Sequence, residues 1–306
     1  MSRVVFLLLP GLHLLDLAGP AQVFSTAANL GHRYHLSYVA QGGEVVSAQG
    51  LPLHAGTSWP ALTGDDLIVV PGSLVAEPPR WPKLHAASAE RLREHHAAGG
   101  TVASVCSGAD VLGQAGLLRG RRCTTHHDLQ DELARRHPAA SVVRDVLFVE
   151  DDRIITSAGI ASGIDLALHL VATRHGPGAA AQVARGMVVY ARRNGDDQQA
   201  SAMLRHRSHL NDAVHRVQDL IDARFTEPLP LAALAAASGC SERTLTRSFV
   251  RATGLTPLRY QQVLRAERAE HLLGQGATAE AAAHAVGFAD ARMLRRLRAR
   301  GSAESL

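Results

Sequence analysis

Short apolar runs alternate with stretches of helical periodicity along residues 1–193, and no other feature of the sequence restricts the fold as much. The apolar runs have the length and composition of buried strands: Val4–Leu9, Tyr34–Ala40, Leu67–Val70, Thr101–Val105 and Ile154–Thr156. The helix-like stretches between them are Pro20–Leu30, Pro82–Ala98, Asp128–Arg136 and Ile160–His175. Such alternation is typical of a mostly parallel sheet with helices on both faces. We therefore predict an α/β sandwich for residues 1–193.

The character of the sequence changes after residue 193. The segment Asn194–Gln199 is polar and rich in turn-forming residues, which favours a linker over residues 194–209. Beyond it the strand pattern stops and helical periodicity continues, starting with Leu210, Val214 and Val217. We predict an all-α domain over residues 210–306, and a chain of 306 residues is long enough for two domains.

The C-terminal domain contains two segments with the composition of a helix-turn-helix unit. Two helices that cross closely need a small residue at the crossing and a glycine at the turn. Ala235 and Gly239 meet these needs in the first segment, and Ala281–Ala285 and Gly287 meet them in the second. The outward-facing side chains of the second helix in each unit are predicted to contact DNA: Arg243, Thr246 and Arg247, and then Arg292, Arg295 and Arg296.

The distribution of charge agrees with a DNA partner. From Gln199 to the end, 15 arginines stand against 10 acidic residues, a net charge of +5, while the rest of the chain carries a net charge of −1. Positive charge therefore gathers in the segment with the two helix-turn-helix units, as suits an anionic partner.

Two such units joined by a long helix resemble the AraC family over residues 214–300. The matching residues are Leu231, Leu234, Ala235, Gly239, Ser241–Leu245, Arg247, Phe249, Gly254, Thr256, Pro257, Tyr260, Arg265, Ala269, Leu272, Leu273 and Gly287–Asp290. The resemblance implies that the two second helices enter successive major grooves of promoter DNA. The sequence departs from the family at Arg298, where members have Phe, and ends at Leu306 without their last helix. A regulator with an altered tail that no longer binds DNA is therefore one alternative.

The run Thr101–Ala109 has the pattern of a strand, a sharp turn and a helix start, with Cys106 at the turn. A turn of this kind holds a nucleophile out of the sheet edge. The helix N-terminus is predicted to lower the pKa of the thiol and to favour the thiolate. The backbone N–H of Ser107, together with that of Gly72 or Ser73, is predicted to form an anion-binding pocket.

The residues around this turn resemble the ThiJ/PfpI group of class I glutamine amidotransferase-like domains over residues 4–193. The matching segments are Leu15–Pro20, Val23–Phe24, Val70–Gly72, Cys106–Ala109, Ala115–Leu118, Thr124–His126, Thr156–Gly159 and Ser162–His169. The resemblance implies a flavodoxin-like fold in which Asp16 approaches Cys106, as in isonitrile hydratases, with His126 nearby. The ligand-binding residues expected from pattern and resemblance are Asp16, Gly72, Ser73, Cys106, Ser107 and His126. Ser107 stands where peptidase-like members have His, so we do not expect a Cys–His dyad.

The combined architecture predicts a cytoplasmic AraC-type regulator whose N-terminal domain senses a small metabolite. The resemblance implies an amine or amino-acid derivative as inducer, and a homodimer acting on promoter DNA. The alternative is a Cys-dependent enzyme, isonitrile-hydratase-like or glyoxalase-like, in which Asp16 relays a proton while Cys106 attacks an electrophilic carbon. The three cysteines are too sparse for a disulfide framework, and their spacing predicts neither a metal site nor a cofactor. No apolar run reaches the roughly 18 residues that span a bilayer, so no membrane partner is expected.

Overall fold

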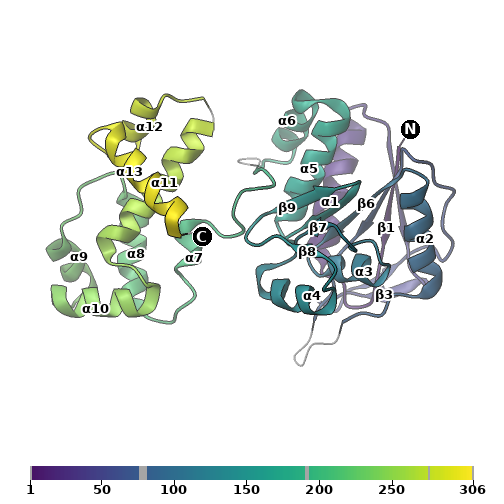
Figure 1. The fold of residues 1–306 in the computed structure, drawn as a ribbon, viewed down its shortest axis with the longest axis horizontal. Coiled ribbons are helices and arrows are strands. Elements are labelled where there is room, and N and C mark those ends of the chain that lie inside the picture. Colours follow the sequence, from purple (N-terminus) through teal and green to yellow (C-terminus); the bar gives the residue numbers. More distant parts are fainter. Residues whose placement is uncertain (1, 76–80, 190–192, 275, 305–306) are drawn as a thin grey trace. The chain divides into compact units, whose positions relative to one another are not determined.

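The computed structural model describes residues 2–75, 81–189, 193–274 and 276–304 and divides the chain into two compact units, Met1–Gln199 and Ala200–Leu306 (Figure 1). The division falls inside the segment that the sequence predicts as a linker. Residues 194–199 belong to the first unit because they bond to it: the carbonyl of Gly195 accepts the N–H groups of Leu147 and Phe148 at 2.8 and 3.1 Å. In the described ranges, no helix is both long and apolar enough to cross a membrane.

A six-stranded sheet forms the centre of the first unit. Its strands lie in the order β2 (Tyr34–Val39), β1 (Ser2–Leu7), β5 (Leu67–Val70), β6 (Thr101–Val105), β10 (Ile154–Ser157) and β9 (Phe148–Asp151). Neighbouring strands are parallel except for β9, which pairs antiparallel with β10. The five predicted strands correspond to β1, β2, β5, β6 and β10. Two small pairs flank this sheet: β3 (Glu44–Val46) with β4 (Pro52–His54), and β7 (Arg122–Cys123) with β8 (Ser141–Val142).

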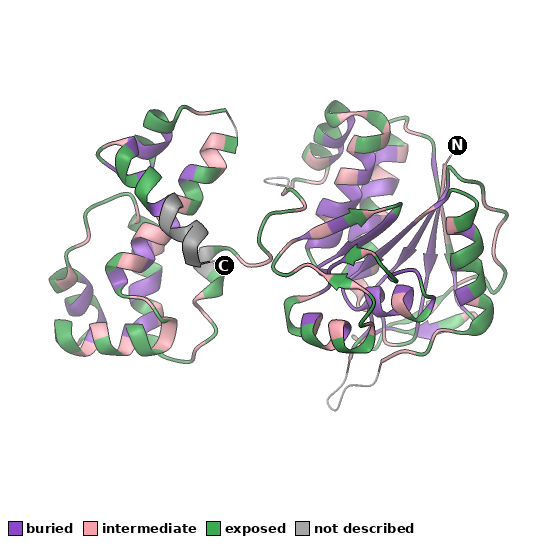
Figure 2. Ribbon diagram, viewed as in Figure 1, coloured by how far each residue is buried: buried purple, intermediate pink, exposed green. Residues whose placement is uncertain are grey.

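Helices cover both faces of the sheet, and the buried strands lie between them (Figure 2). One layer contains α1 (Leu14–Asn29), α5 (Ser162–His175) and α6 (Pro177–Gly186), and the other contains α2 (Ala86–Ala97) and α3 (Gly108–Gln114). A further helix, α4 (Gln130–Arg136), follows the short 3-10 helix η1 (His127–Leu129). Val4 and Phe6 of β1 pack into one layer while Val5 and Leu7 pack into the other. Burial on both faces explains the continuous apolar runs, and the predicted flavodoxin-like sandwich is confirmed.

The second unit is helical throughout the residues described. Its helices are α7 (Ala202–Arg205), α8 (Asp212–Arg224), α9 (Leu231–Ser238), α10 (Glu242–Thr253), α11 (Pro257–Gly274), α12 (Ala279–Ala285) and α13 (Ala291–Glu304). One apolar cluster centres on Phe249 and Tyr260, and a second contains Phe288 and Leu294. Helix α11 contributes to both clusters, so the two helix-turn-helix units share this helix.

Arg265 of α11 ties the two helix-turn-helix units together. Its guanidinium donates to the carbonyls of Phe225, Glu227 and Gly287 at 2.5, 2.9 and 3.0 Å. The same group lies over the ring of Phe288, 5.6 Å from the centroid. Gly287 is the turn of the second helix-turn-helix unit, and Phe225 follows α8. These bonds therefore hold that turn against the helices of the first helix-turn-helix unit.

Candidate cysteine site and nucleic-acid interface

Cys106 lies on a sharp turn between β6 and α3. Its φ is 55°, in the left-handed region that costs a side-chain-bearing residue energy. Two glycines leave room for this turn. A Cβ on Gly159 would lie 2.2 Å from Cβ of Cys106, and a Cβ on Gly108 would lie 2.3 Å from the carbonyl oxygen of Val70. The turn therefore depends on residues without side chains on both sides.

Four neighbouring strands place the site residues at one edge of the sheet. Asp16 lies beyond the end of β1, Gly72 beyond β5, Cys106 beyond β6 and Ile160 beyond β10. Oδ1 of Asp16 accepts the N–H of Ile160 at 2.7 Å. A Cβ on Gly72 would lie 2.5 Å from Oδ2 of Asp16 and 2.8 Å from Cβ of Cys106. The carboxyl ends of parallel strands are where open α/β sheets bind ligands.

Burial governs the titration of both groups. Burial raises the pKa of Asp16 to about 6, although the N–H groups of Ile160 and Gly72 and the Cys106 thiol lower it. Burial, and then the charge of Asp16, raise the pKa of Cys106 to about 12. The predicted low pKa of the thiol is therefore wrong, because α3 has only seven residues and its dipole does not offset desolvation. At neutral pH the site holds a thiol beside a carboxylate.

The predicted anion-binding pocket is largely used by the protein itself. The Ser107 hydroxyl accepts the N–H of Ser73 and donates to the Ser73 carbonyl, both at 2.7 Å, so that N–H already has a partner. The N–H of Gly72 favours the charged form of Asp16, and that of Ser107 favours the charged form of Cys106. The structure thus brings five predicted site residues together: Asp16, Gly72, Ser73, Cys106 and Ser107. The N–H of Ser73, however, donates to the Ser107 hydroxyl and is not available to a ligand.

His126 precedes η1, and its Nδ1 accepts the N–H of Asp128 at 3.4 Å. Burial lowers the pKa of His126, as do His127 and His13, whereas Asp128 raises it. Donor atoms of His126, His127 and Asp128 lie within 4.8 Å of one another, a possible metal-binding group among the described residues. Their proximity follows from their adjacency in the chain, and Nδ1 of His127 already pairs with Asp128 at 2.9 Å. We therefore assign no metal to them.

Sequence reasoning assigned no site role to His13, Gly159 or Ile160, although Gly159 ends one of the segments that match the ThiJ/PfpI group. His13 directly precedes α1, whose first turn contains Asp16, and its N–H donates to the carbonyl of Gly72 at 2.9 Å, so its position was a usable signal. Ile160 acts through its backbone N–H, which every residue except proline carries, so no sequence pattern marks it.

The stability of the first unit is expected to fall as the pH rises through the pKa of Asp16. The folded pKa of about 6 lies above the ordinary 3.8, so this stabilisation is complete below about pH 4. This stabilisation is lost as the pH rises past 6. A pKa shift of this size corresponds to about 3 kcal/mol in the free energy of unfolding. Urea unfolding of the parent and of Asp16→Asn between pH 4 and pH 8 measures the effect. Parallel curves for the two proteins would contradict it.

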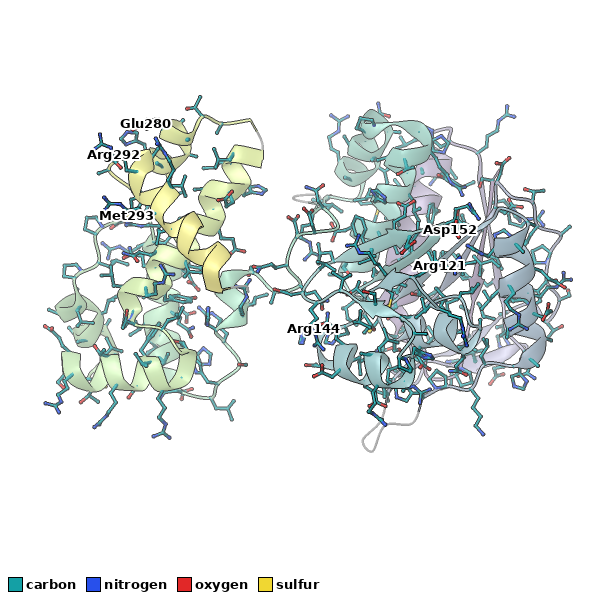
Figure 3. All side chains as sticks on the ribbon, viewed as in Figure 1. Arg121, Arg144, Asp152, Glu280, Arg292 and Met293 are labelled. Atoms are coloured by element: carbon teal, nitrogen blue, oxygen red, sulfur yellow. The ribbon has the colours of Figure 1, made fainter. Side chains whose placement is uncertain are left out.

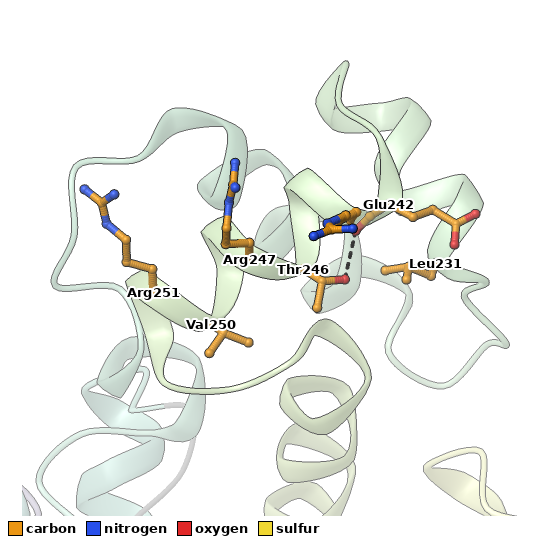
Figure 4. A pocket seen from close by; sticks show the side chains of 7 residues that line it. Leu231, Glu242, Thr246, Arg247, Val250 and Arg251 are labelled. Atoms are coloured by element: carbon orange, nitrogen blue, oxygen red, sulfur yellow. Dashed lines mark hydrogen bonds between the residues drawn. The ribbon is translucent and has the colours of Figure 1, made fainter.

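The first helix-turn-helix unit presents the predicted face of α10 to solvent. Helix α9 ends at Gly239, whose φ is 71°, and α10 begins where Oγ of Ser241 accepts the N–H of Thr244 at 3.3 Å. A shallow groove follows the outer face of α10 (Figure 4), and its lining residues are Leu231, Glu242, Arg243, Thr246, Arg247, Val250 and Arg251. The predicted Arg243, Thr246 and Arg247 therefore share one face. Arg251, one turn beyond Arg247, was missed although its spacing marks it.

The second helix-turn-helix unit has the same organisation as the first. Oδ1 of Asp290 accepts the N–H groups of Arg292 and Met293 at 2.8 and 3.3 Å and thus caps α13. Leu294 and Leu297 are buried. Arg292, Arg295 and Arg296 are exposed, and Figure 3 shows Arg292 beside Met293 on this helix. The side chain of Arg298, where the sequence departs from the AraC pattern, lies outside those described.

Comparison with known proteins agrees with both units. Residues 2–173 match the DJ-1/PfpI family, and residues 234–302 match a helix-turn-helix domain. The HTH-type transcriptional regulator CdhR of Pseudomonas aeruginosa is 32% identical over 275 residues, which cover 88% of this chain and 80% of that protein. The isonitrile hydratase of Pseudomonas putida is 36% identical over 171 residues, 55% of this chain and 70% of that protein.

A crystal structure of an AraC family transcriptional regulator from Pseudomonas putida superposes with a TM-score of 0.54 at 26% identity, covering 61% of this chain and all of that one. The family match to the first unit spans more than half of the chain, and the CdhR match runs through both units. The chain therefore belongs to the DJ-1/PfpI family and is an AraC-type transcriptional regulator, with a DJ-1/PfpI domain at the N-terminus and a DNA-binding helix-turn-helix domain at the C-terminus.

Proposed function

We propose that the first unit senses a small amine or amino-acid derivative at the Cys106 site and that the second unit converts this signal into a change at promoter DNA. The observation that carries the proposal is the convergence of Asp16, Gly72 and Cys106 at the ligand-binding edge of the sheet, in a chain with a DNA reader. Asp16 and the exposed Asp128 give this edge negative charge, which suits an ammonium group.

The site also explains why a ligand role is favoured over nucleophilic turnover. Cys106 is only 5% exposed and its thiol stays protonated at neutral pH, so it is a weak nucleophile at rest.

Leu74 is 53% exposed and Leu15 is 43% exposed, and both lie on the elements that carry Ser73 and Asp16. We infer that these exposed leucines contribute to the contact between two copies of the chain in a cytoplasmic homodimer, since regulators that read two half-sites are commonly two-fold symmetric.

Replacing both Arg243 and Arg247 by alanine is expected to weaken binding to the preferred DNA site by about 30-fold or more. Each arginine that contacts a base contributes on the order of 1–3 kcal/mol. The measurement is selection of bound fragments from a genomic pool at one fixed salt concentration, because phosphate contacts make affinity depend strongly on salt. The parent should enrich one sequence motif, and the double variant should lose it.

The matched control is Arg216→Ala with Arg268→Ala, which removes the same charge from α8 and α11 of the same unit. This control should keep the enriched motif with a modest, sequence-independent loss of affinity. Equal loss in both double variants would assign the effect to net charge and would contradict the reading face on α10. A parent that enriches no motif would contradict the proposed role at promoter DNA.

A second candidate function is Cys-dependent catalysis, favoured by the Asp16 carboxyl beside the Cys106 thiol in a unit similar to isonitrile hydratase. In such a reaction Asp16 takes the thiol proton while the sulfur attacks an electrophilic carbon. Turnover of an isonitrile by the parent, abolished in Cys106→Ser, would establish it. A parent without turnover leaves sensing as the role of the site.

A further inference from the structure

The last described residues of the first unit, 193–199, form a strap that is fastened to that unit at three places. At its start, Arg193 binds Asp165 of α5 through three bonds. The Arg193 backbone N–H donates to Oδ1 at 3.0 Å, and Nε and Nη2 donate to Oδ2 at 3.0 and 2.6 Å. Asp165 is buried while the Arg193 side chain is 39% exposed, so this ion pair is shielded from water and salt on the Asp165 side only. The strap therefore begins at a firm anchor.

The middle of the strap lies flat on β9. The carbonyl of Gly195 accepts N–H groups from Leu147 and Phe148, and a Cβ on Gly195 would lie 2.7 Å from the ring of Phe148. Only glycine permits this approach. The strap is thus seated against the sheet by shape as well as by hydrogen bonds.

The end of the strap is bonded to the segment that supports the cysteine turn. Nε2 of Gln199 donates to the carbonyls of Thr125 and Val146 at 2.9 and 3.1 Å. Oγ1 of Thr125 donates to the carbonyl of Cys106 at 2.8 Å. Thr125 is fully buried, so no water replaces that bond. Two hydrogen bonds therefore connect the Cys106 turn to Gln199, after which the second unit begins.

The other end of the strap reaches the same site by a different route. Asp165, which holds Arg193, lies in the first turn of α5. The loop that leads into α5 contains Ile160, whose N–H binds Asp16, and Gly159, which packs on Cys106. A shift at the Cys106–Asp16 pair thus acts on both anchors of the strap, through Thr125 at one end and through the start of α5 at the other.

We infer that the strap is the element through which the Cys106 site controls the second unit. In the resting protein the strap is fastened and restricts the chain that leads into α7. A change at the Cys106 turn displaces Thr125, releases Gln199 and frees that chain, an order-to-disorder switch. The inference rests on the sensing role proposed above and names its route. Linkage requires the reverse effect too, so releasing the strap must alter the Cys106 turn.

Hydrogen exchange of the full chain tests the route without using DNA. Alkylation of Cys106 by N-ethylmaleimide, in a Cys240→Ser background, provides the change at the turn, since Cys123 is fully buried. The backbone N–H groups of Arg193 and Gln199 donate to Asp165 and Asp145, which lie outside the strap, so these two amides report its release. We expect these amides to exchange about fivefold faster or more after alkylation, because opening no longer breaks a buried bond. The amides of β1 and β5 should keep their rates.

Thr125→Val removes the bond to Cys106 and keeps the shape of the side chain. In this variant the strap should exchange faster before alkylation, and alkylation should add little. The matched control is Thr124→Val, since Thr124 is equally buried but its hydroxyl donates to the carbonyl of Val143 at 2.9 Å. This control should keep the parent's response to alkylation.

Equal strap exchange in the parent and in the alkylated parent would overturn the inference, as would the same response in Thr125→Val and Thr124→Val. If Cys106 resists alkylation, Cys106→Met introduces a comparable change at the turn and is judged by the same amides. A strap that responds in a protein that enriches no DNA motif would sustain the route and reject the proposed regulatory function, so the two failures are distinguishable.

Discussion

Replacing Gly159 by alanine is expected to destabilise the first unit by about 4 kcal/mol, the sum of backbone strain and overpacking. The φ of Gly159 is +96°, which L-residues with side chains rarely adopt. Its added Cβ would lie 2.2 Å from Cβ and 2.9 Å from Sγ of Cys106, so the turn must shift. Both tryptophans of the chain, Trp59 and Trp81, lie in this unit, so tryptophan fluorescence during urea unfolding reports its stability alone.

Gly116→Ala is the matched control for this variant. Gly116 has a φ of +79°, but an added Cβ would meet nothing within 4 Å. Its cost is therefore the backbone alone, about 1–2 kcal/mol. Similar losses of stability in the two variants would show that contact with Cys106 contributes nothing and that the turn tolerates a side chain at position 159.

The sheet was predictable because its central strands are buried on both faces. Leu67–Val70 and Ile154–Ser157 are apolar or small at every position, and such runs have few other places in a soluble domain. Strand β9 was not predicted, because Phe148–Asp151 is only four residues long and has two apolar residues followed by two acidic ones, which is no strand pattern. Its place at the edge of the sheet depends on pairing with β10, which no local pattern reveals.

The chemistry of the cysteine site was only partly predictable. The resemblance to the ThiJ/PfpI group placed Asp16 beside Cys106, and the structure agrees. The predicted direction of the shift in the thiol's pKa was wrong, because the sequence shows the helix that follows Cys106 but not how deeply the thiol is buried. The strap was missed for a related reason. Gly195 and Gln199 have the composition of a free linker, while their partners come from residues 125 and 145–148, far away in the sequence.

Replacing Gly287 by alanine is expected to undock the second helix-turn-helix unit and to shorten the DNA segment that the protein covers. The φ of Gly287 is +84°, and an added Cβ would lie 2.0 Å from the carbonyl oxygen of Thr226. Strain and overpacking together amount to about 4 kcal/mol. The carbonyl of Gly287 also accepts from Arg265, so a shift of this turn breaks the bond that ties α11 to it. Nuclease footprinting on the enriched DNA site measures the length covered.

The comparison with Gly239→Ala separates docking from turn strain. Gly239 is the equivalent turn of the first helix-turn-helix unit. Its φ is +71°, but an added Cβ there would meet nothing within 4 Å. This variant should lose about 1–2 kcal/mol and keep the full footprint. Gly287→Ala should keep only the part read by α10, because the first apolar cluster does not include α12 or α13. An unchanged footprint in Gly287→Ala would contradict the prediction that this turn holds the second helix-turn-helix unit in its DNA-reading position.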